Sequence, residues 1–336
     1  MRFVPSRGRR LLLAAVATVM TLSACSTTGT QDDGANAAAS AAAGGQFPVT
    51  VTTAFGDITI PQQPKRVVTL GWSDAEVALA LGVQPVGDAD WMAFGGDGQG
   101  AWNQGRYTTP PQKVGTLEVD MEKVAALKPD LILDTRSSGD KTRYDQLAGL
   151  GVPVVDIPVG AQAYRTTWEQ QLDLVSKALG KTAEAAKLKA DLDAQFASVA
   201  AANPNFKGKT VSAGVKTSRG WGAYVSGDGR VDFLQKLGFQ DAPAIEQLKG
   251  DSFSVQLSQE QVGKLDADLT TIFMIGVTAD EVKSDKLLQA VPSVKAGHVV
   301  YLDDKSISTA FSSNSVLGLK YALDKVPPLI ATALNG

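Results

Sequence analysis

The order of strand-like and helix-like segments predicts an α/β protein with two similar lobes, each built on a mostly parallel sheet, joined by one long α-helix. Short β-type runs and amphipathic segments alternate on both sides of residues 167–203, as they do in parallel α/β sheets. The stretch 167–203 itself has helical periodicity with only Gly180 as an interruption. A helix-into-strand unit also occurs twice, as VDMEKVAALKPDLIL from residue 119 and LSQEQVGKLDADLTT from residue 257.

The first lobe is predicted over residues 47–166. Its expected strands are continuous runs of Val, Ile and Leu, which are typical of strands buried on both faces of a parallel sheet. The first expected helix ends at Gly82, because glycine is favoured just after the last helical turn. In chain order the segments are RVVTL, DAEVALALG, QPVGDA, a Gly/Trp/Pro loop over residues 95–111, MEKVAALK, DLILDT, DKTRYDQLAGLG and VPVVDI.

The linking helix is predicted over residues 167–203, because Pro204 cannot continue it. The second lobe is predicted over residues 204–336 and restarts the alternation of strands and helices. Its segments in order are the strand KTVSAGVKT, a loop RGWGAYVSGDG, the helix VDFLQKLG, the repeated LSQEQVGKL, the strand LTTIFMIG, the helix DKLLQA, the strand HVVYLD and a closing helix VLGLKYALDKVPPLIATAL.

Residues 1–24 have the pattern of an export signal. Four arginines precede an apolar run, LLLAAVATVM, that is too short to span a bilayer. Leu22-Ser23-Ala24-Cys25 resembles the lipobox of bacterial lipoproteins, which implies cleavage before Cys25 and lipidation of that cysteine. The alternative is an ordinary secretory signal with a chance cysteine. Residues 25–46 are rich in Ser, Thr, Gly and Ala and are predicted to form a flexible tether.

Charge and cysteine content exclude several functions. Without the four leader arginines, 28 basic residues remain against 35 acidic ones, a net charge of −7. No basic stripe remains, which argues against binding nucleic acid. Cys25 is the only cysteine, so once it is lipidated the protein has no disulfide, thiolate metal site or cysteine nucleophile. The only histidine, His298, is interpreted as a structural residue at a strand entry.

Aromatic and arginine side chains follow several of the predicted strands. Ligands of open α/β sheets bind beyond the carboxyl ends of the strands, so these side chains are expected at a cleft between the lobes. Aromatic faces and guanidinium groups suit a large planar ligand that is anionic or rich in oxygen. The competing interpretation is that some of them pack beneath their own loops. The candidates are Trp72, Trp91, Trp102, Arg136, Tyr164, Arg165, Arg219, Trp221 and Tyr224.

Taken together, several stretches resemble the substrate-binding proteins of bacterial ABC importers, in particular the iron-siderophore-binding type with a rigid interlobe helix. The resemblance rests on the lipobox, KRVVTLGWSDAEVALALGVQPVG, LKPDLIL followed by LGVPVV, the linking helix, YVSGDGRVDFLQKLG and the terminal ALDKV. It implies a lipid-anchored, extracytoplasmic receptor that binds a ferric siderophore between its lobes and delivers it to a membrane permease. The iron arrives already chelated, so no cofactor and no metal ligand of the protein is expected, and the chain is expected to act as a monomer.

The resemblance also gives a role to one glutamate in each copy of the repeated unit. Glu122 and Glu260 match the surface carboxylates with which relatives dock into basic pockets of the permease. The alternative is local, because a carboxylate in a first helical turn is stabilised by the helix dipole by about 0.3–1 kcal/mol. Two equivalent carboxylates on two lobes favour docking, since a two-fold permease could bind both through arginines.

Other ligands and an enzymatic role stay open at this point. Haem would need axial ligation from Tyr or Met, and cobalamin would also suit a cleft lined by tryptophans. The arginines favour an anionic or oxygen-rich ligand over cobalamin. No G-x-S-x-G elbow or Walker lysine occurs, so an enzyme is not expected; a secreted hydrolase using paired carboxylates is the remaining enzymatic alternative.

Overall fold

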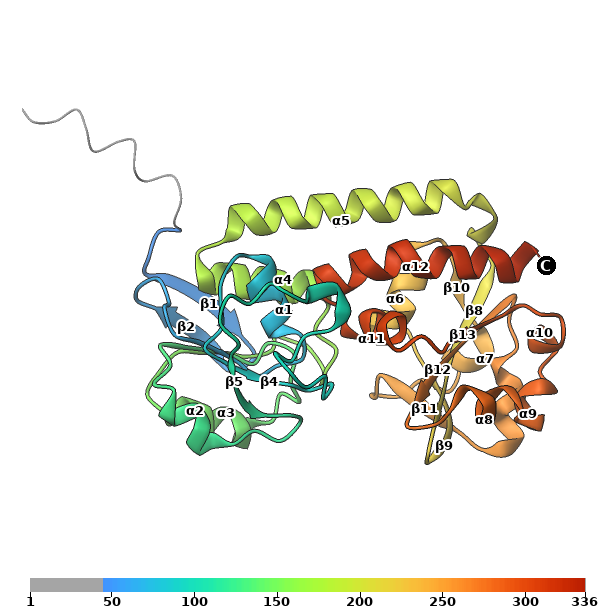
Figure 1. Ribbon diagram of the computed structural model, residues 1–336, viewed down its shortest axis with the longest axis horizontal. Coiled ribbons are helices and arrows are strands. Elements are labelled where there is room, and N and C mark those ends of the chain that lie inside the picture. Colours follow the sequence, from blue (N-terminus) through green and yellow to red (C-terminus); the bar gives the residue numbers. More distant parts are fainter. Residues whose placement is uncertain (1–44, 336) are drawn as a thin grey trace, which may run out of the picture. The chain divides into compact units, whose positions relative to one another are not determined.

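The computed structural model describes residues 45–335 of the 336-residue chain. The predicted signal peptide, Cys25 and the tether up to residue 44 lie outside the described residues. Within the described part, the predicted α/β class is confirmed, with one main sheet in each lobe and a separate two-stranded sheet in the first (Figure 1). Both lobes belong to one compact unit.

The first lobe begins with an antiparallel hairpin, β1 (Val49–Thr53) and β2 (Gly56–Ile60), and continues into a five-stranded sheet. All neighbouring strands of that sheet are parallel, in the order β5-β4-β3-β6-β7. The strands are β3 (Val67–Thr69), β4 (Gly87–Ala89), β5 (Gln112–Gly115), β6 (Leu131–Leu133) and β7 (Val154–Val155). The first of them, β3, is central, so the chain order reverses between β3 and β6, the position where such sheets bind ligands.

The helical segments of the first lobe lie between these strands, as the alternation predicted. They are α1 (Asp74–Ala80), η1 (Ala101–Asn103), α2 (Met121–Ala126) and α3 (Lys141–Ala148). Side-chain caps explain where α2 and α3 begin: Asp120 accepts a hydrogen bond from the backbone N–H of Lys123, and Asp140 accepts one from that of Arg143. Such caps satisfy backbone donors that a helix leaves unpaired at its start.

The sheet of the second lobe is mixed. Its main order is β11-β9-β8-β12-β13, with β10 pairing to one end of β8. β8 (Thr210–Thr217), β10 (Gln240–Asp241), β12 (Leu269–Ile275) and β13 (Val299–Leu302) pair in parallel, whereas β9 (Gly220–Tyr224) and β11 (Ser254–Leu257) pair antiparallel. The helical segments of this lobe are η2 (Pro204–Phe206), α6 (Gly229–Lys236), α7 (Pro243–Glu246), η3 (Gln259–Leu265), α8 (Ala279–Lys283), α9 (Lys286–Gln289), α10 (Pro292–Lys295), α11 (Lys305–Ser313) and α12 (Val316–Asn335).

Strand β9 corrects the prediction of a loop over RGWGAYVSGDG. A tight turn pairs Thr217 with Gly220 and returns the chain along β8. Two glycines within five residues hid the strand, because glycine is depleted in strands and common in loops. Side chains alternate between the faces of a strand, so Trp221 and Tyr224, three residues apart, point to opposite faces of the sheet.

The predicted linking helix over 167–203 consists of two helices, α4 (Trp168–Leu179) and α5 (Thr182–Ala202). Gly180 ends α4 with a left-handed backbone, φ 66°, a conformation that glycine adopts at little cost. A capping box between Thr167 and Gln170 defines the start of α4. α4 packs against α1 and β1 of the first lobe, and α5 carries the chain across to α6 of the second (Figure 1).

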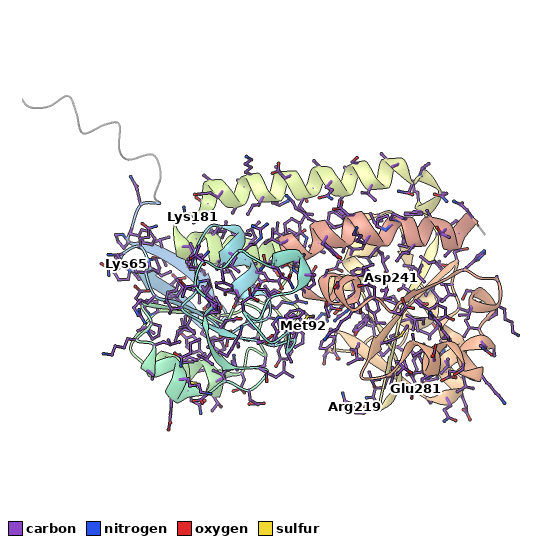
Figure 2. The ribbon with its side chains drawn as sticks, in the orientation of Figure 1. Lys65, Met92, Lys181, Arg219, Asp241 and Glu281 are labelled. Carbon is purple, nitrogen blue, oxygen red and sulfur yellow. The ribbon has the colours of Figure 1, made fainter. Side chains whose placement is uncertain are left out.

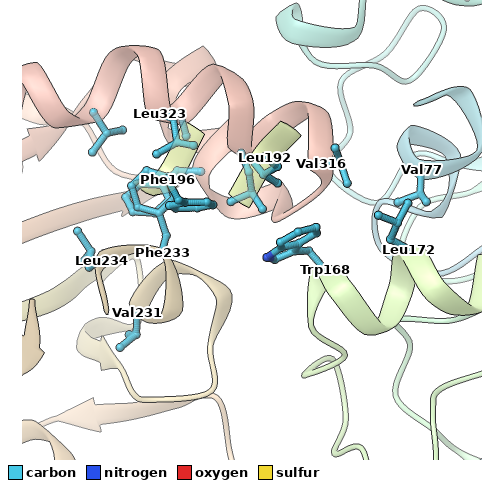
Figure 3. Close-up of a cluster of buried hydrophobic side chains, with 14 of the residues drawn as sticks. Val77, Trp168, Leu172, Leu192, Phe196, Val231, Phe233, Leu234, Val316 and Leu323 are labelled. Carbon is cyan, nitrogen blue, oxygen red and sulfur yellow. The ribbon is translucent and has the colours of Figure 1, made fainter. Parts of the chain in front are cut away.

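A hydrophobic cluster connects the lobes through these helices. Trp168 and Leu172 of α4, Leu192 of α5, Phe233 of α6 and Val316 of α12 are all buried in it (Figure 3). Burying a large apolar side chain contributes roughly 1.5–3 kcal/mol, and α12 extends the same cluster by packing on both α5 and α1. The continuous core favours small relative movements of the lobes, because a large opening would expose these side chains to water. Among residues 45–335, no helix has the length and apolarity needed to cross a membrane.

Candidate functional site

A cavity of about 680 Å³ lies between the two lobes. Its volume is within the roughly 300–1,000 Å³ typical of small-molecule sites. The first lobe contributes loops that follow β3, β4 and β5, and the second lobe contributes the ends of β9, β12 and β13 together with α6 and α11. The lining residues are Trp72, Trp91, Met92, Leu117, Tyr224, Arg230, Phe253, Met274, Ile275, Gly276, Val277, Ala279, Leu302, Asp303, Lys305, Ser308, Thr309 and Ser312.

Three stacked aromatic rings form the wall of the first lobe. The ring of Trp72 lies between Trp91, at a centroid distance of 4.5 Å, and Tyr164, at 4.3 Å, with interplanar angles of 12° and 24°. Phe253 of the second lobe meets Trp72 edge-on at 6.4 Å. Aromatic pairs in such geometry contribute about 0.5–1.5 kcal/mol each beyond burial, so the stack holds Trp72 in a defined orientation.

The turn that presents Trp72 is tied down by a buried carboxylate. Oδ2 of Asp74 accepts hydrogen bonds from the backbone N–H groups of Gly71 and Thr135, each at 3.0 Å. The loop that follows β6 approaches so closely that a Cβ on Gly71 would lie 2.8 Å from the backbone N of Arg136 and would also contact Asp74. Glycine is therefore required at position 71, and the ends of β3 and β6 are connected directly at the cavity. Burial raises the pKa of Asp74 to about 6.

Tyr224 and Arg230 form the facing wall in the second lobe. The guanidinium carbon of Arg230 lies 4.0 Å from the centroid of the Tyr224 ring, a cation–π geometry. Nη1 of Arg230 donates to both carboxylate oxygens of Asp228, at 3.1 and 3.0 Å, and Nε donates to Oγ of Ser312 at 3.2 Å. Sequence reasoning missed Arg230, although it follows directly on the YVSGDG stretch; the loop predicted there drew attention to Arg219 instead.

Arg136 supports the ring stack and does not line the large cavity. It is buried, its guanidinium carbon lies 5.8 Å from the Trp72 ring centroid, and its Nη1 donates to the carbonyl of Ser313 at 2.7 Å. Nε donates to the carbonyl of Tyr164 at 3.3 Å. Burial lowers the pKa of Arg136 to about 10, so the side chain still carries its charge at neutral pH.

The lobes are also joined by buried polar contacts beside the cavity. Ser73, the residue after Trp72, donates from its hydroxyl to the same carbonyl of Ser313 at 2.7 Å. Oε2 of Glu76 in α1 accepts hydrogen bonds from the hydroxyl of Ser315 and from Nε1 of Trp102, the latter at 2.7 Å. Burial raises the pKa of Glu76 to about 7.

Besides Arg136 and Tyr164, which lie next to Trp72, four more of the predicted ligand residues lie away from the cavity lining. Trp102 is held by Glu76 and packs against Phe94 and Tyr321. Trp221 is only 5% exposed, lies in a separate hydrophobic cluster and donates from Nε1 to Asp285 at 3.0 Å.

Arg165 and Arg219, the other two, have different surroundings. Arg165 donates from Nη2 to the carbonyl of Ser226 at 2.8 Å and so contacts the second lobe through its backbone. Arg219 is exposed in the β8–β9 turn, at the edge of the second lobe (Figure 2), and does not line the cavity. The structure thus gathers Trp72, Trp91, Tyr164 and Tyr224 around the cavity, with Arg136 behind them.

Both glutamates of the repeated unit are exposed. Glu122 lies in the first turn of α2, and Glu260 lies in the first turn of η3. Each glutamate lies in a helical segment that precedes an interior strand of its sheet, β6 or β12. The segment is an α-helix in the first copy of the unit and a 3₁₀ helix in the second. In residues 45–335, no three His, Cys, Asp or Glu side chains come together as a group that could hold a metal ion.

Comparison with known proteins identifies relatives over most of the chain. The "Probable siderophore-binding lipoprotein YfiY" of Bacillus subtilis (strain 168) is 27% identical over 296 residues, which cover 80% of this chain and 82% of that protein. The "Fe(3+)-citrate-binding protein YfmC" of the same organism is 28% identical over 279 residues, covering 81% and 84%. Among solved structures, PiaA of Streptococcus pneumoniae TIGR4 in complex with ferrichrome superposes with a TM-score of 0.73 at 25% identity, covering 85% of this chain and 99% of that one.

A family model supports the same assignment. The model described as "Periplasmic binding protein" matches residues 67–306, from strand β3 to the beginning of α11. This range includes both sheets, the two linking helices and nearly all of the cavity lining. The chain therefore belongs to the periplasmic binding protein family.

Proposed function

We propose that the protein is an extracytoplasmic, lipid-anchored receptor that binds a ferric siderophore between its lobes and delivers it to an ABC permease for iron uptake. The observation that carries this proposal is the cavity of about 680 Å³, with the Trp72 stack on one side and Tyr224 with Arg230 on the other. The relatives named for siderophore and ferric citrate binding, and the structural neighbour with ferrichrome, support the same function.

The cavity suits a caged ion because its side chains act on the surface of a ligand. The outer indole face of Trp91 and the exposed edge of the Trp72 ring offer apolar area to the organic part of a chelate. Arg230 and the hydroxyl of Ser308 offer hydrogen-bond donors to chelating oxygens. The iron stays in its chelate throughout, so binding and release change no covalent bond and the protein is not an enzyme.

Delivery needs partners outside the cavity. We assign permease docking to Glu122 and Glu260, which are exposed and lie before central strands of the two sheets. Arginines on a two-fold permease would bind both carboxylates with charge-assisted hydrogen bonds. Lipidation of Cys25 would hold the receptor near that permease, with residues 25–46 as its tether.

The test is a titration of the purified protein with ferric siderophores, followed by tryptophan fluorescence. Two of the five tryptophans line the cavity, so a bound ferric chelate should quench fluorescence and should be recovered chemically unchanged. Trp91→Ala should weaken binding about tenfold, because it removes one stacking face. Trp221→Phe is the matched control and should bind like the wild type, since Trp221 lies outside the cavity.

The same titration includes haem, cobalamin and the apo-siderophores. Saturable binding of haem or cobalamin with no response to any ferric chelate would overturn the proposal. A ligand that returns hydrolysed would instead identify an enzyme.

A further inference from the structure

We propose that the cavity selects ferric chelates of low net charge, such as the neutral trishydroxamates, over the highly anionic triscatecholates and polycarboxylates. This inference rests on the proposed function and concerns the same cavity. The named relatives leave the ligand class open, since one is named for ferric citrate and another was solved with ferrichrome. Two features of the cavity favour such chelates: most of the charges around it are already paired within the protein, and its rim is apolar.

Most of the charge at the cavity is already compensated within the protein. Three charged side chains line it, namely Arg230, Asp303 and Lys305. Arg230 is only 8% exposed and shares two hydrogen bonds with Asp228, which is itself buried. Asp303 forms an ion pair with Lys283 at 2.7 Å. Lys305, exposed at the start of α11, is the lining cation to which the described residues offer no ion-pair partner.

The other arginines predicted for the ligand are directed elsewhere. Arg136 carries a charge close to the stack but does not line the cavity, and two of its donors bind the carbonyls of Ser313 and Tyr164. Arg165 donates to backbone carbonyls of the second lobe. Arg219 lies in a distant turn. A multiply negative ligand would therefore find at most one or two uncompensated cations and few free guanidinium donors.

The rim of the cavity is apolar on both lobes. Leu117 of the first lobe is 59% exposed and Ile275 of the second is 54% exposed, and both line the cavity. Met92, Met274 and Val277 extend the apolar lining between them. Entering such a site removes water from the ligand, and the loss of hydration is severe for a multiply charged ion that finds too few partners. A neutral chelate with an apolar outer surface loses far less and gains from burying that surface.

Siderophore classes differ in the net charge of their ferric complexes, which follows from simple charge balance. Each hydroxamate contributes one negative charge, so three of them neutralise Fe³⁺. Each catecholate contributes two, so a triscatecholate complex retains three negative charges. The two types of complex are similar in size and both present oxygen atoms around iron, which makes their charge the property that the cavity can discriminate.

The experiment measures dissociation constants for ferrichrome, ferric enterobactin and ferric citrate with the full mature protein at fixed ionic strength. Ferrichrome, a neutral trishydroxamate, should bind at least about tenfold more tightly than triply negative ferric enterobactin, a difference of about 1.4 kcal/mol. Tighter binding of ferric enterobactin or ferric citrate would overturn the inference and leave the proposed function intact. If the protein binds none of these three chelates and no other ferric chelate, the proposed function itself is overturned.

Asp228→Asn provides an independent test, because it leaves Arg230 uncompensated while asparagine can still cap α6. In this variant the preference for ferrichrome over ferric enterobactin should fall by roughly tenfold. Asp193→Asn removes the same charge from exposed helix α5 and should leave the ratio unchanged. An unaltered ratio in Asp228→Asn, with its circular dichroism and thermal midpoint like those of the wild type, would overturn the assigned role of charge compensation. If Asp228→Asn does not fold, the ratio of the wild-type dissociation constants for ferrichrome and ferric enterobactin still decides the proposal.

Discussion

Replacing Glu76 by glutamine tests the buried contact between the lobes through the pH dependence of stability. Glu76 accepts hydrogen bonds from Trp102 and Ser315, and burial raises its pKa from an ordinary 4.5 to about 7. Between these two values the folded protein holds a proton that the unfolded chain has released. Its stability therefore falls as the pH rises through this interval. The stabilisation is fully present below pH 4.5 and is lost once the pH exceeds about 7.

The magnitude follows from the difference between the two pKa values. Each pKa unit corresponds to 1.36 kcal/mol, so ionisation of Glu76 costs the folded state about 3 kcal/mol between pH 4.5 and pH 7. Glutamine keeps an oxygen that can accept the hydrogen bonds of Trp102 and Ser315, and it does not titrate. Glu76→Gln should therefore lose less stability than the wild type over the same pH interval, by an amount of this order.

The assay is urea unfolding of both proteins at several pH values from 4.5 to 8, monitored by circular dichroism. Other buried carboxylates, such as Asp74 and Asp156, also have raised pKa values, and they contribute equally to both proteins. Only the difference between the two curves reports on Glu76. Parallel curves over the whole range would refute the reasoning, because they would mean that Glu76 has the same pKa in the folded and unfolded chains.

Three further predictions concern the core, the cavity turn and the partner. Leu192→Ala should lower the free energy of unfolding by about 2–5 kcal/mol in urea titrations, because Leu192 is fully buried where α5 meets the interlobe cluster. Gly71→Ala should weaken siderophore binding in the fluorescence titration and destabilise the fold, since the new Cβ meets Asp74 and the backbone of the loop after β6; wild-type affinity in a folded variant would contradict the tight approach. The double variant Glu122→Lys and Glu260→Lys should abolish iron uptake by cells while leaving the dissociation constant unchanged, and a fall in affinity would argue against docking.

The order of strands and helices could be predicted from the sequence because it depends on local patterns. Continuous apolar runs marked β3 and β6, and glycine marked the end of α1. Two local errors have identifiable causes. The sequence marked Gly180 as an interruption, but glycine in the middle of a helical pattern is also compatible with one continuous helix, so the pattern did not show that the helix ends there. The glycines of β9 suggested a loop. Without a predicted strand, the sequence could not show that Trp221 and Tyr224 point to opposite faces of the sheet.

The candidate site was only partly predictable because its charges depend on long-range partners. The position after a parallel strand was a sound guide for Trp72 and Trp91, which follow the neighbouring strands β3 and β4. The partners of the arginines were harder to predict, because a guanidinium group near a strand end can bind a ligand, a carboxylate or a backbone carbonyl. The three-dimensional structure decides among these: Arg230 binds Asp228, while Arg136 and Arg165 bind carbonyls across the interface between the lobes.

The carbonyl of Ser313 links the shape of the cavity to the angle between the lobes. It accepts hydrogen bonds from Ser73 and Arg136, which flank Trp72 on the first lobe, and it terminates α11, whose side chains line the opposite wall. A membrane partner that twisted the lobes apart would break both hydrogen bonds and withdraw Trp72 from α11 in the same movement. Release of the ligand would then need no separate trigger, because the carbonyl oxygen of Ser313 both connects the lobes and holds the residues that position Trp72.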